Sequence, residues 1–263
     1  MKKRPKVALV LSGGGALGFA HIGVIDVLQK HKIPIDMIVG TSMGAIVGGA
    51  VACGRKVSEL EEVVCKMRTR HLFDFNLNFK GIFSGKSALK FIKREIPNID
   101  QKDTKIPFYC NALDLVKSKE VVFKEGNLIE NIRASMSIPG VFTPVKRDNM
   151  VLVDGGIVNN MGHDIARREG ADIIIAVDVI SKSEFSKNVK NLIQCTLQSI
   201  LIMQKELQQA KRKYYNVIIQ PELGHKKQYD FNGKSTKEVI ELGRIATEEK
   251  IKKIKEIIIN YNN

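Results

Sequence analysis

Short apolar runs recur along the chain and are separated by polar or glycine-containing segments. They cover residues 7–11, 35–39, 107–112, 120–123, 150–153 and 173–179. A continuous apolar run of this length is typical of a strand that is buried on both faces of a sheet. We therefore expect these segments to form a sheet, with residues 173–179 as its last strand.

A helical pattern replaces the continuous one between several of these runs. Residues 16–30 place apolar side chains around a helical period, and residues 44–53 are small enough to pack closely on a sheet. The same spacing returns over residues 189–213 and 237–261. Strands and helices that alternate in this way form βαβ units. The fold class that follows is α/β, a mostly parallel sheet covered by helices.

The length and composition indicate one globular enzyme domain. A chain of 263 residues can bury one large core, and its hydrophobic content of 44% is ordinary. Tryptophan is absent and the other aromatic residues are few, which argues against a surface that stacks on sugars or bases. An enzyme fits this composition better than a binding module.

The formal net charge of +14 attracts anionic partners through its long-range field. Phospholipid surfaces and nucleic acid both qualify by charge alone. The basic residues are scattered and show no nucleic-acid-binding motif, so we expect no nucleic-acid partner. A solvated basic surface that keeps the protein soluble explains the excess equally well.

The chain start resembles the basic region of a signal peptide, but the apolar run that follows ends at Leu11 and enters glycines. No stretch reaches the roughly 18 apolar residues that a membrane-spanning helix needs. We therefore expect a cytoplasmic protein, at most peripheral at the inner membrane surface. The cysteines show no metal-binding spacing, and we expect them to be reduced. They are Cys53, Cys65, Cys110 and Cys195.

The last predicted helix carries four lysines beside a stripe of isoleucines. They are Lys250, Lys252, Lys253 and Lys255. In one interpretation the stripe lies on an anionic membrane; in the other it packs on the sheet. The sequence leaves this choice open, and it leaves the oligomeric state open too.

Gly40-Thr41-Ser42-Met43-Gly44 follows the run at 35–39 and opens the small-residue helix, which is the setting of a nucleophile elbow. A sharp turn between strand and helix projects the serine hydroxyl into solvent. Gly40 and Gly44 carry no Cβ that would collide with the neighbouring helix or strand. The helix aims its first N–H groups, including that of Met43, at the place where an oxyanion would form. Ser42 is therefore a candidate nucleophile.

A serine nucleophile needs a base. An α/β-hydrolase would place its elbow after several strands and use a histidine, whereas here one strand precedes the elbow. None of the histidines has a triad setting, and we interpret each as a surface or packing residue. They are His21, His31, His71, His163 and His225.

Asp154 follows the run at 150–153 and is the alternative base. It stands at the carboxyl end of a predicted strand, on the side of an α/β sheet where sites form. Gly155 and Gly156 leave room for close backbone approach. The competing interpretation is a plain turn in which the aspartate bonds its own backbone.

The loop Ser12-Gly13-Gly14-Gly15 joins the first strand to the first helix, so its N–H groups can form a small anion-binding nest. With Ser42 nearby, the bound anion would be a tetrahedral oxyanion. Gly13, Gly15 and Gly18 also match the dinucleotide fingerprint, which requires an acidic residue at the far end of the second strand. The only candidate, Asp36, lies at the start of that strand. Nucleotide binding is therefore the weaker interpretation.

These elements in this order resemble the patatin-like phospholipase family, in particular its bacterial members. Further segments that resemble its signatures are residues 23–25, 81–85, 133–142 and 159–160. The resemblance runs from about residue 7 to residue 179. We expect one domain over residues 1–263, in which helices of about residues 189–263 pack on or beside this core.

The resemblance implies a three-layer α/β/α fold and a Ser-Asp dyad that hydrolyses lipid acyl esters through an acyl-enzyme. Ser42 would attack the ester carbonyl, Asp154 would accept its proton, and the amides of residues 13–15 would stabilise the oxyanion. The implied substrate is a lipid or phospholipid ester, and no cofactor or calcium is expected. Two alternatives stay open: an acyltransferase that uses the same serine, and a weak regulatory or nucleotide-binding protein.

The chain departs from the family pattern at two places. Leu17 stands where members usually carry Arg or Lys, so cationic support of the oxyanion loop would be missing. Gly162-His163 replaces a proline-valine step after the two asparagines, which we expect to loosen the loop behind Asp154. Both changes bear on the rate and the substrate range rather than on the dyad.

Overall fold

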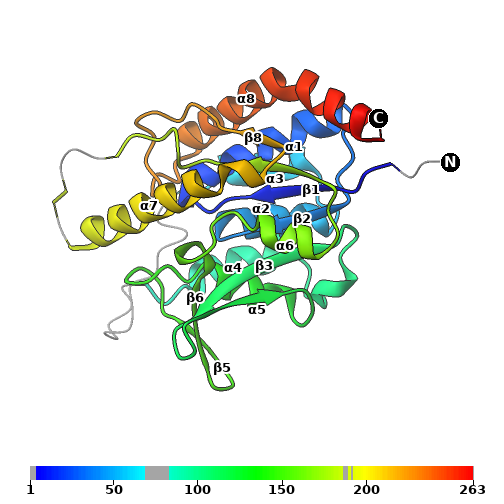
Figure 1. Ribbon diagram of the computed structural model, residues 1–263. Helices are drawn as coiled ribbons and strands as arrows, with labels where there is room; N and C mark the ends of the chain where they lie inside the picture. The colour runs from blue at the N-terminus through cyan, green and yellow to red at the C-terminus, as the bar shows by residue number, and fades with distance from the viewer. Residues whose placement is uncertain (1–3, 69–82, 186–188, 191, 263) are drawn as a thin grey trace.

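The computed structural model describes residues 4–68, 83–185, 189–190 and 192–262 (Figure 1). Within these residues, eight strands form one sheet in the order β5-β6-β3-β2-β1-β7-β8, with β4 paired to β3. Strands β3, β2, β1, β7 and β8 are parallel, while β4, β5 and β6 run antiparallel to their neighbours. The bounds are β1 (Val7–Leu11), β2 (Met37–Gly40), β3 (Phe108–Asp114), β4 (Lys119–Phe123), β5 (Val145–Arg147), β6 (Met150–Asp154), β7 (Ile173–Val177) and β8 (Val217–Ile219).

Helices cover both faces of this sheet. They are α1 (Ala20–Lys30), α2 (Met43–Ala52), α3 (Val57–Cys65), α4 (Lys86–Glu95), α5 (Leu128–Ser135), α6 (His163–Arg168), α7 (Leu192–Lys211) and α8 (Gly233–Ile259). Alternate residues of β1 point to opposite faces: Leu9 joins the large core with α1, α2 and α8, and Val10 joins a smaller core with α6. The expected α/β class with a mostly parallel sheet is confirmed.

The prediction that residues 173–179 form the last strand was wrong. Strand β8 (Val217–Ile219) pairs in parallel with β7 and extends the sheet beyond it. Three residues are too few to show a strand period among the polar residues around them, which is why the pattern did not reveal β8. The four shorter helices α3 to α6 also went unpredicted.

Helix α8 packs directly on α1, because glycines let the two backbones meet. A Cβ on Gly23 of α1 would lie 2.0 Å from the carbonyl oxygen of Ile240, and one on Gly243 of α8 would lie 2.2 Å from that of Ala20. Figure 1 shows the two helices side by side. The C-terminal isoleucine stripe is turned inward, with Ile254 fully buried. The stripe therefore packs on the protein, as the second interpretation has it.

The described chain offers no helix with both the length and the apolar character needed to cross a bilayer. The four cysteines are unpaired in the structure, with Cys110 buried and Cys195 exposed.

Replacing Gly243 with alanine tests the contact between α1 and α8. We expect Gly243→Ala to lower the free energy of unfolding by about 1–3 kcal/mol, because the added methyl group forces the helices apart. The higher helix propensity of alanine offsets only about 1 kcal/mol of this effect. Urea unfolding measures the change, and Lys252→Ala at an exposed position of α8 is the control. An unfolding midpoint as high as that of the wild type would contradict the packing described.

Candidate active site

Ser42 occupies the turn between β2 and α2 in a backbone conformation that non-glycine residues rarely adopt, with φ 54° and ψ −118°. Its backbone N–H donates to Oγ of Ser135 at 3.0 Å. The flanking glycines are required by contact: a Cβ on Gly40 would lie 2.4 Å from the carbonyl oxygen of Gly44, and one on Gly44 would lie 2.3 Å from that of Leu11. The strand, turn and helix of a nucleophile elbow are therefore present.

The structure corrects one expectation about this serine. Ser42 does not project into bulk solvent but is buried at the wall of a cavity. The cover comes partly from α7 and from the loop that carries Gln228 and Tyr229, both far along the chain. The sequence around the elbow contains no pattern that predicts this cover.

Asp154 ends strand β6 and contacts Ser42. Burial of its carboxyl group raises its pKa to about 6, while hydrogen bonds with the Ser42 side chain and the Gly156 N–H oppose this shift. The Gly156 N–H donates to Oδ1 of Asp154 at 2.8 Å. The plain-turn interpretation is thus half right, because Asp154 does bond its own backbone. The same carboxylate also faces a serine that has no other base beside it in the described part of the cavity.

The sequence argument that placed Asp154 at the site was wrong, although the placement was right. Strand β6 runs antiparallel to β3, so the rule for carboxyl ends of parallel strands does not apply to it. Asp154 reaches the site because β6 overlaps only the end of β3. Asp154 pairs with Ala112, two residues beyond Cys110, which pairs with Gly40 at the elbow.

A buried polar network ties the elbow to the segment after Asp154. The Thr41 hydroxyl donates to Oδ1 of Asn111 at 2.8 Å. The Asn111 amide donates in turn to Oε1 of Glu120 and to the carbonyl oxygen of Asn159, both at 2.8 Å. A Cβ on Gly155 would lie 2.5 Å from Asn111, so this glycine is needed for the network to close. Sequence reasoning missed Asn111, which sits within an apolar strand.

The glycine-rich loop lies against Ser42 and the cavity. The N–H of Gly13 donates to Oδ1 of Asn160 at 2.9 Å, so in this structure it is occupied. Gly14 and Gly15 have φ angles of 156° and 57° and also line the cavity. Within the described chain, the N–H groups of Gly14, Gly15 and Met43 bond to no protein acceptor. These three donors are the ones free to bind an anion beside Ser42.

The contacts of Asp36 and Gly18 argue against a dinucleotide site. Asp36, the acidic residue considered for that role, accepts hydrogen bonds from Arg4 at 2.6 Å and from the N–H of Val7 at 2.8 Å. Val7 begins β1, so Asp36 lies at the edge of the sheet opposite the loop. A Cβ on Gly18 would lie 2.5 Å from Cγ of Met43, so this glycine serves the contact with the elbow.

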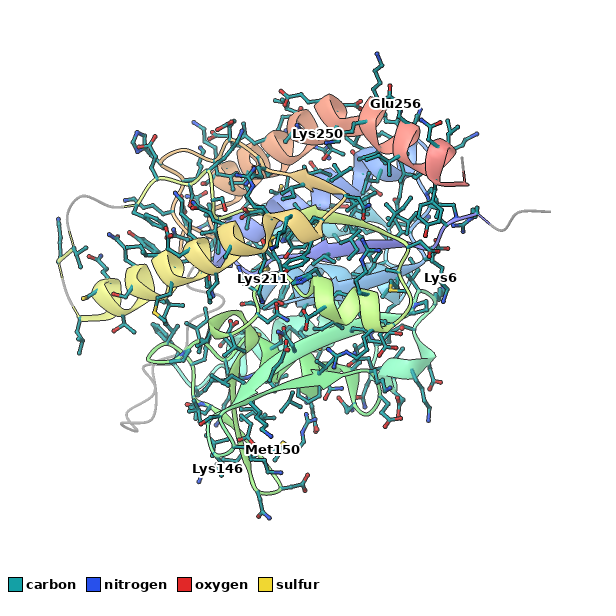
Figure 2. The ribbon with its side chains drawn as sticks, viewed as in Figure 1. Lys6, Lys146, Met150, Lys211, Lys250 and Glu256 are labelled. Atoms are coloured by element: carbon teal, nitrogen blue, oxygen red, sulfur yellow. The ribbon has the colours of Figure 1, made fainter. Side chains whose placement is uncertain are left out.

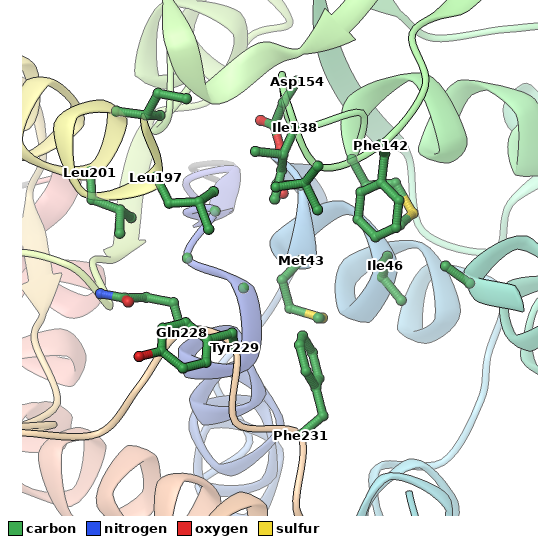
Figure 3. Close-up of a pocket in the computed structure, with 18 of the residues that line it drawn as sticks. Met43, Ile46, Ile138, Phe142, Asp154, Leu197, Leu201, Gln228, Tyr229 and Phe231 are labelled. Carbon is green, nitrogen blue, oxygen red and sulfur yellow. The ribbon is translucent and has the colours of Figure 1, made fainter. Parts of the chain in front are cut away.

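The cavity beside Ser42 has a volume of about 400 Å³ and a largely apolar lining. Figure 3 shows Leu197 and Leu201 of α7 on one side and Met43, Ile46 and Phe142 across from them. No lysine, arginine or histidine is among the described residues that line it. The cavity therefore suits a hydrocarbon chain, with the Ser42 and Asp154 pair at its wall.

Two buried glutamines of α7 were missed by the sequence analysis. Gln204 lines the cavity, and its Nε2 lies 2.5 Å from where a Cβ on Gly156 would be. Gln208, one turn later, is buried, and neither polar atom of its side chain has a hydrogen-bond partner in the described chain. Helix α7 also carries Gln194, Gln198 and Gln209, so no spacing in the sequence singles out Gln204 and Gln208.

The histidines of the described chain stay outside the site. His21 is buried below the glycine loop, where its Nε2 contacts the carbonyl oxygen of Ser12 at 2.8 Å, and burial lowers its pKa to about 4. His163 stacks on Tyr214, with ring centroids 4.6 Å apart. This contact packs the ring of His163, while the expected effect of Gly162-His163 on the loop behind Asp154 stays a prediction. His71 lies outside the described residues, as do Gly81 and Ile82 of one family-like segment.

Leu17, where the family usually carries a basic residue, is fully buried in the core. A hydrocarbon side chain fills this position, and no cation is found among the cavity-lining residues that the structure describes. Among the described residues, the groups free to stabilise an anion at Ser42 are backbone N–H groups.

The raised pKa of Asp154 predicts that its charge costs folding stability. Because the folded-state pKa of about 6 exceeds the ordinary value of 3.8 for an aspartate, the cost is absent below about pH 4 and complete above about pH 6. We expect Asp154→Asn to raise the free energy of unfolding at pH 8 by up to about 3 kcal/mol, and not to raise it at pH 3.5. Thermal unfolding across this pH range measures the difference.

Asp36→Asn is the matched control, because the hydrogen bond and charge of Arg4 lower the pKa of Asp36. It should destabilise the protein at pH 8, where Asp154→Asn stabilises it. A loss of stability in both variants at pH 8 would contradict the environment described for Asp154.

Comparison with known proteins gives a consistent picture. The family model described as patatin-like phospholipase matches residues 9–167. The chain is 35% identical over 186 residues to patatin-like phospholipase domain-containing protein 6 of Mus musculus, covering 68% of this chain and 14% of that protein. It is 36% identical over 177 residues to an uncharacterized NTE family protein of Mycobacterium tuberculosis, covering 66% and 49%. The chain thus spans at most about half the length of these relatives.

Two solved structures share the fold. VipD from Legionella pneumophila superposes with a TM-score of 0.64 at 12% identity, covering 95% of this chain and 67% of that one. The type III effector protein ExoU of Pseudomonas aeruginosa gives 0.53 at 12% identity, covering 96% and 53%. At this identity the likeness concerns the fold alone.

Proposed function

The chain belongs to the patatin-like phospholipase family, and on that premise we propose that it hydrolyses carboxylic esters of lipids with Ser42 as nucleophile and Asp154 as base. One observation carries the proposal. Ser42 and the buried carboxylate of Asp154 lie together at the wall of an apolar cavity of about 400 Å³, and the interaction with Ser42 opposes the rise in the pKa of Asp154. This arrangement joins an activated hydroxyl to a place for an acyl chain.

In the first half of the reaction, Oγ of Ser42 attacks the ester carbonyl carbon while Asp154 takes the hydroxyl proton. A carboxylate is an effective base here because its burial raises its pKa to about 6, nearer to working pH. The tetrahedral intermediate then collapses, and Asp154 gives the proton to the departing alcohol oxygen. The acyl group stays on Ser42 as an ester.

In the second half, water attacks the acyl-enzyme and Asp154 accepts one of its protons. Collapse of the second intermediate returns the proton to Oγ of Ser42 and releases the fatty acid. The carboxylate thus acts as base and then acid in each half of the cycle, without a histidine. We propose that the cycle needs no calcium and no cofactor.

The oxyanion is assigned to the N–H groups of Gly14, Gly15 and Met43. They are free in the described chain, and all three residues line the cavity beside Ser42. The first turn of α2 adds the positive end of a helix dipole. Gly13 supports the loop through its bond to Asn160 and takes no direct part in this assignment. Oxyanion-hole donors of this kind are each worth about 10²–10³ in rate.

Substitution of both dyad residues tests the proposal. We expect Ser42→Ala and Asp154→Asn each to lower kcat for a p-nitrophenyl ester by at least about a thousandfold, since each removes a group that acts in the transition state. A fluorophosphonate should label wild type at one serine, and Ser42→Ala should not be labelled. Turnover is measured in buffer without an acyl acceptor, so that release of p-nitrophenol reports hydrolysis.

Ser58→Ala and Asp148→Asn, both at exposed positions, are the controls and should keep full activity. A fully active Asp154→Asn would rule out the carboxylate base. Turnover that appears only when an alcohol or thiol is added would identify an acyltransferase instead.

The α7 side of the cavity should set acyl-chain length. Leu197→Trp places a larger ring in the cavity, so we expect kcat/KM to fall about tenfold more for a decanoyl ester than for an acetyl ester. Leu207→Trp, at an exposed position on the same helix, is the control and should change neither value. An equal loss on both esters would show that Leu197 does not contact the acyl chain.

A further inference from the structure

Helix α7 is apolar on two opposite faces. One face lines the catalytic cavity with Leu197, Ile200 and Leu201. The other face leaves large apolar side chains open to solvent. They are Leu192, Ile202, Met203 and Leu207, with exposed fractions of 81%, 42%, 56% and 41%. Ile202, Met203 and Leu207 lie within two turns of one another, with the exposed Glu206 between them, and Leu192 lies ten residues earlier. Large exposed apolar side chains gathered on one element mark a candidate interaction site. We call these four side chains the outer face of α7.

Polar residues of α7 face inward while apolar residues face solvent, and the requirements of folding do not explain this arrangement. Gln204 and Gln208 are buried, while their neighbours Met203 and Leu207 are exposed. A helix that faces water normally has the reverse arrangement. Core packing therefore does not account for the outer apolar side chains, and a partner that covers them would.

The charges around α7 indicate the chemistry of that partner. Of its 20 residues only Lys205, Glu206 and Lys211 are charged, whereas charged residues make up 27% of the whole chain. Cations continue beyond both ends, at Lys190 before the helix and at residues 212–213 after it. Figure 2 shows α7 at the margin of the molecule, with Lys211 at its end near the sheet. Lys211 donates to Oδ1 of Asn159 at 3.2 Å within the protein, so the cations that flank the outer face are Lys190 and residues 212–213. An apolar surface with cations at both ends is complementary to a bilayer with acidic head groups.

Helix α7 also connects the molecular surface with the cavity that is the proposed lipid site. The inner face of α7 lines it, and Tyr229, which is itself exposed, lines it across from Leu197. The cavity is thus bounded by side chains that also reach the molecular surface beside α7. A lipid that leaves a membrane under α7 would have a short apolar path to Ser42.

We propose that the outer face of α7 docks on the surface of an anionic phospholipid bilayer, with its apolar side chains in the upper acyl layer. This inference rests on the proposed lipid hydrolase function. It assigns membrane contact to α7 and not to the lysine-rich helix α8, whose isoleucines Ile251 and Ile254 are buried in the protein. The cations near α7 contact lipid phosphates, and the helix presents the cavity to the bilayer.

Vesicle co-sedimentation tests this docking. The protein carries Ser42→Ala so that no lipid is consumed, and the vesicles contain phosphatidylcholine with or without 30% phosphatidylglycerol. We expect binding to the anionic vesicles, and a roughly tenfold lower partition coefficient for Ile202→Gln/Met203→Gln, because two apolar side chains no longer enter the acyl layer. Ile245→Gln/Ile259→Gln on α8 is the matched control, with native exposed fractions of 50% and 72%, and should bind like its parent.

Three outcomes would overturn the docking proposal. These are no binding to anionic vesicles, equal binding by the α7 and α8 variants, or a dimer by light scattering that Ile202→Gln/Met203→Gln converts to a monomer. The last would identify the outer face as a contact between two copies of the chain. Hydrolysis of a soluble p-nitrophenyl ester by the Ser42-containing protein is measured in parallel. If it persists, only the membrane contact fails; if it is absent, the proposed function itself fails.

Discussion

The burial of the Asp154 carboxylate against Ser42 is the constraint on which the rest of the site depends. A charged carboxylate removed from water is unstable unless it is hydrogen-bonded, and this one has two partners, Ser42 and the Gly156 N–H. These two partners offset the cost of burial only in part, so the pKa of the Asp154 carboxyl group is raised to about 6. Burial thus costs stability and, in the proposed mechanism, supplies the proton affinity that the reaction needs.

Close backbone approach is the means by which the fold holds this pair. The contacts of Gly40, Gly44 and Gly155 leave no space for a Cβ, so the elbow, β1 and β3 lie closer together than side chains would permit. The network through Asn111 then joins the elbow to the segment after Asp154. Helix α7 lines the cavity beside the pair with apolar side chains such as Leu197 and Leu201. In this setting the Asp154 carboxylate is buried.

The parts of this site that are local in sequence could be predicted, and the parts assembled from distant segments could not. Ser42 and the glycines around it follow from a strand and a helix only a few residues away. Asp154 was found for a reason that the antiparallel β6 does not support. The sequence analysis missed Asn111 and Gln204 because no short pattern connects them with Ser42. The cover over the serine was missed for the same reason, since α7 comes some 150 residues later.

The pH dependence of fluorophosphonate labelling of Ser42 tests the central claim most directly, because it reports the base that activates the serine without requiring the natural lipid. The rate constant should rise with pH and level off, with a midpoint at about 6 set by Asp154. Asp154→Asn should abolish that rise. A midpoint near 4 would show that Asp154 is an ordinary solvated carboxylate, and an unchanged profile in Asp154→Asn would show that another group is the base.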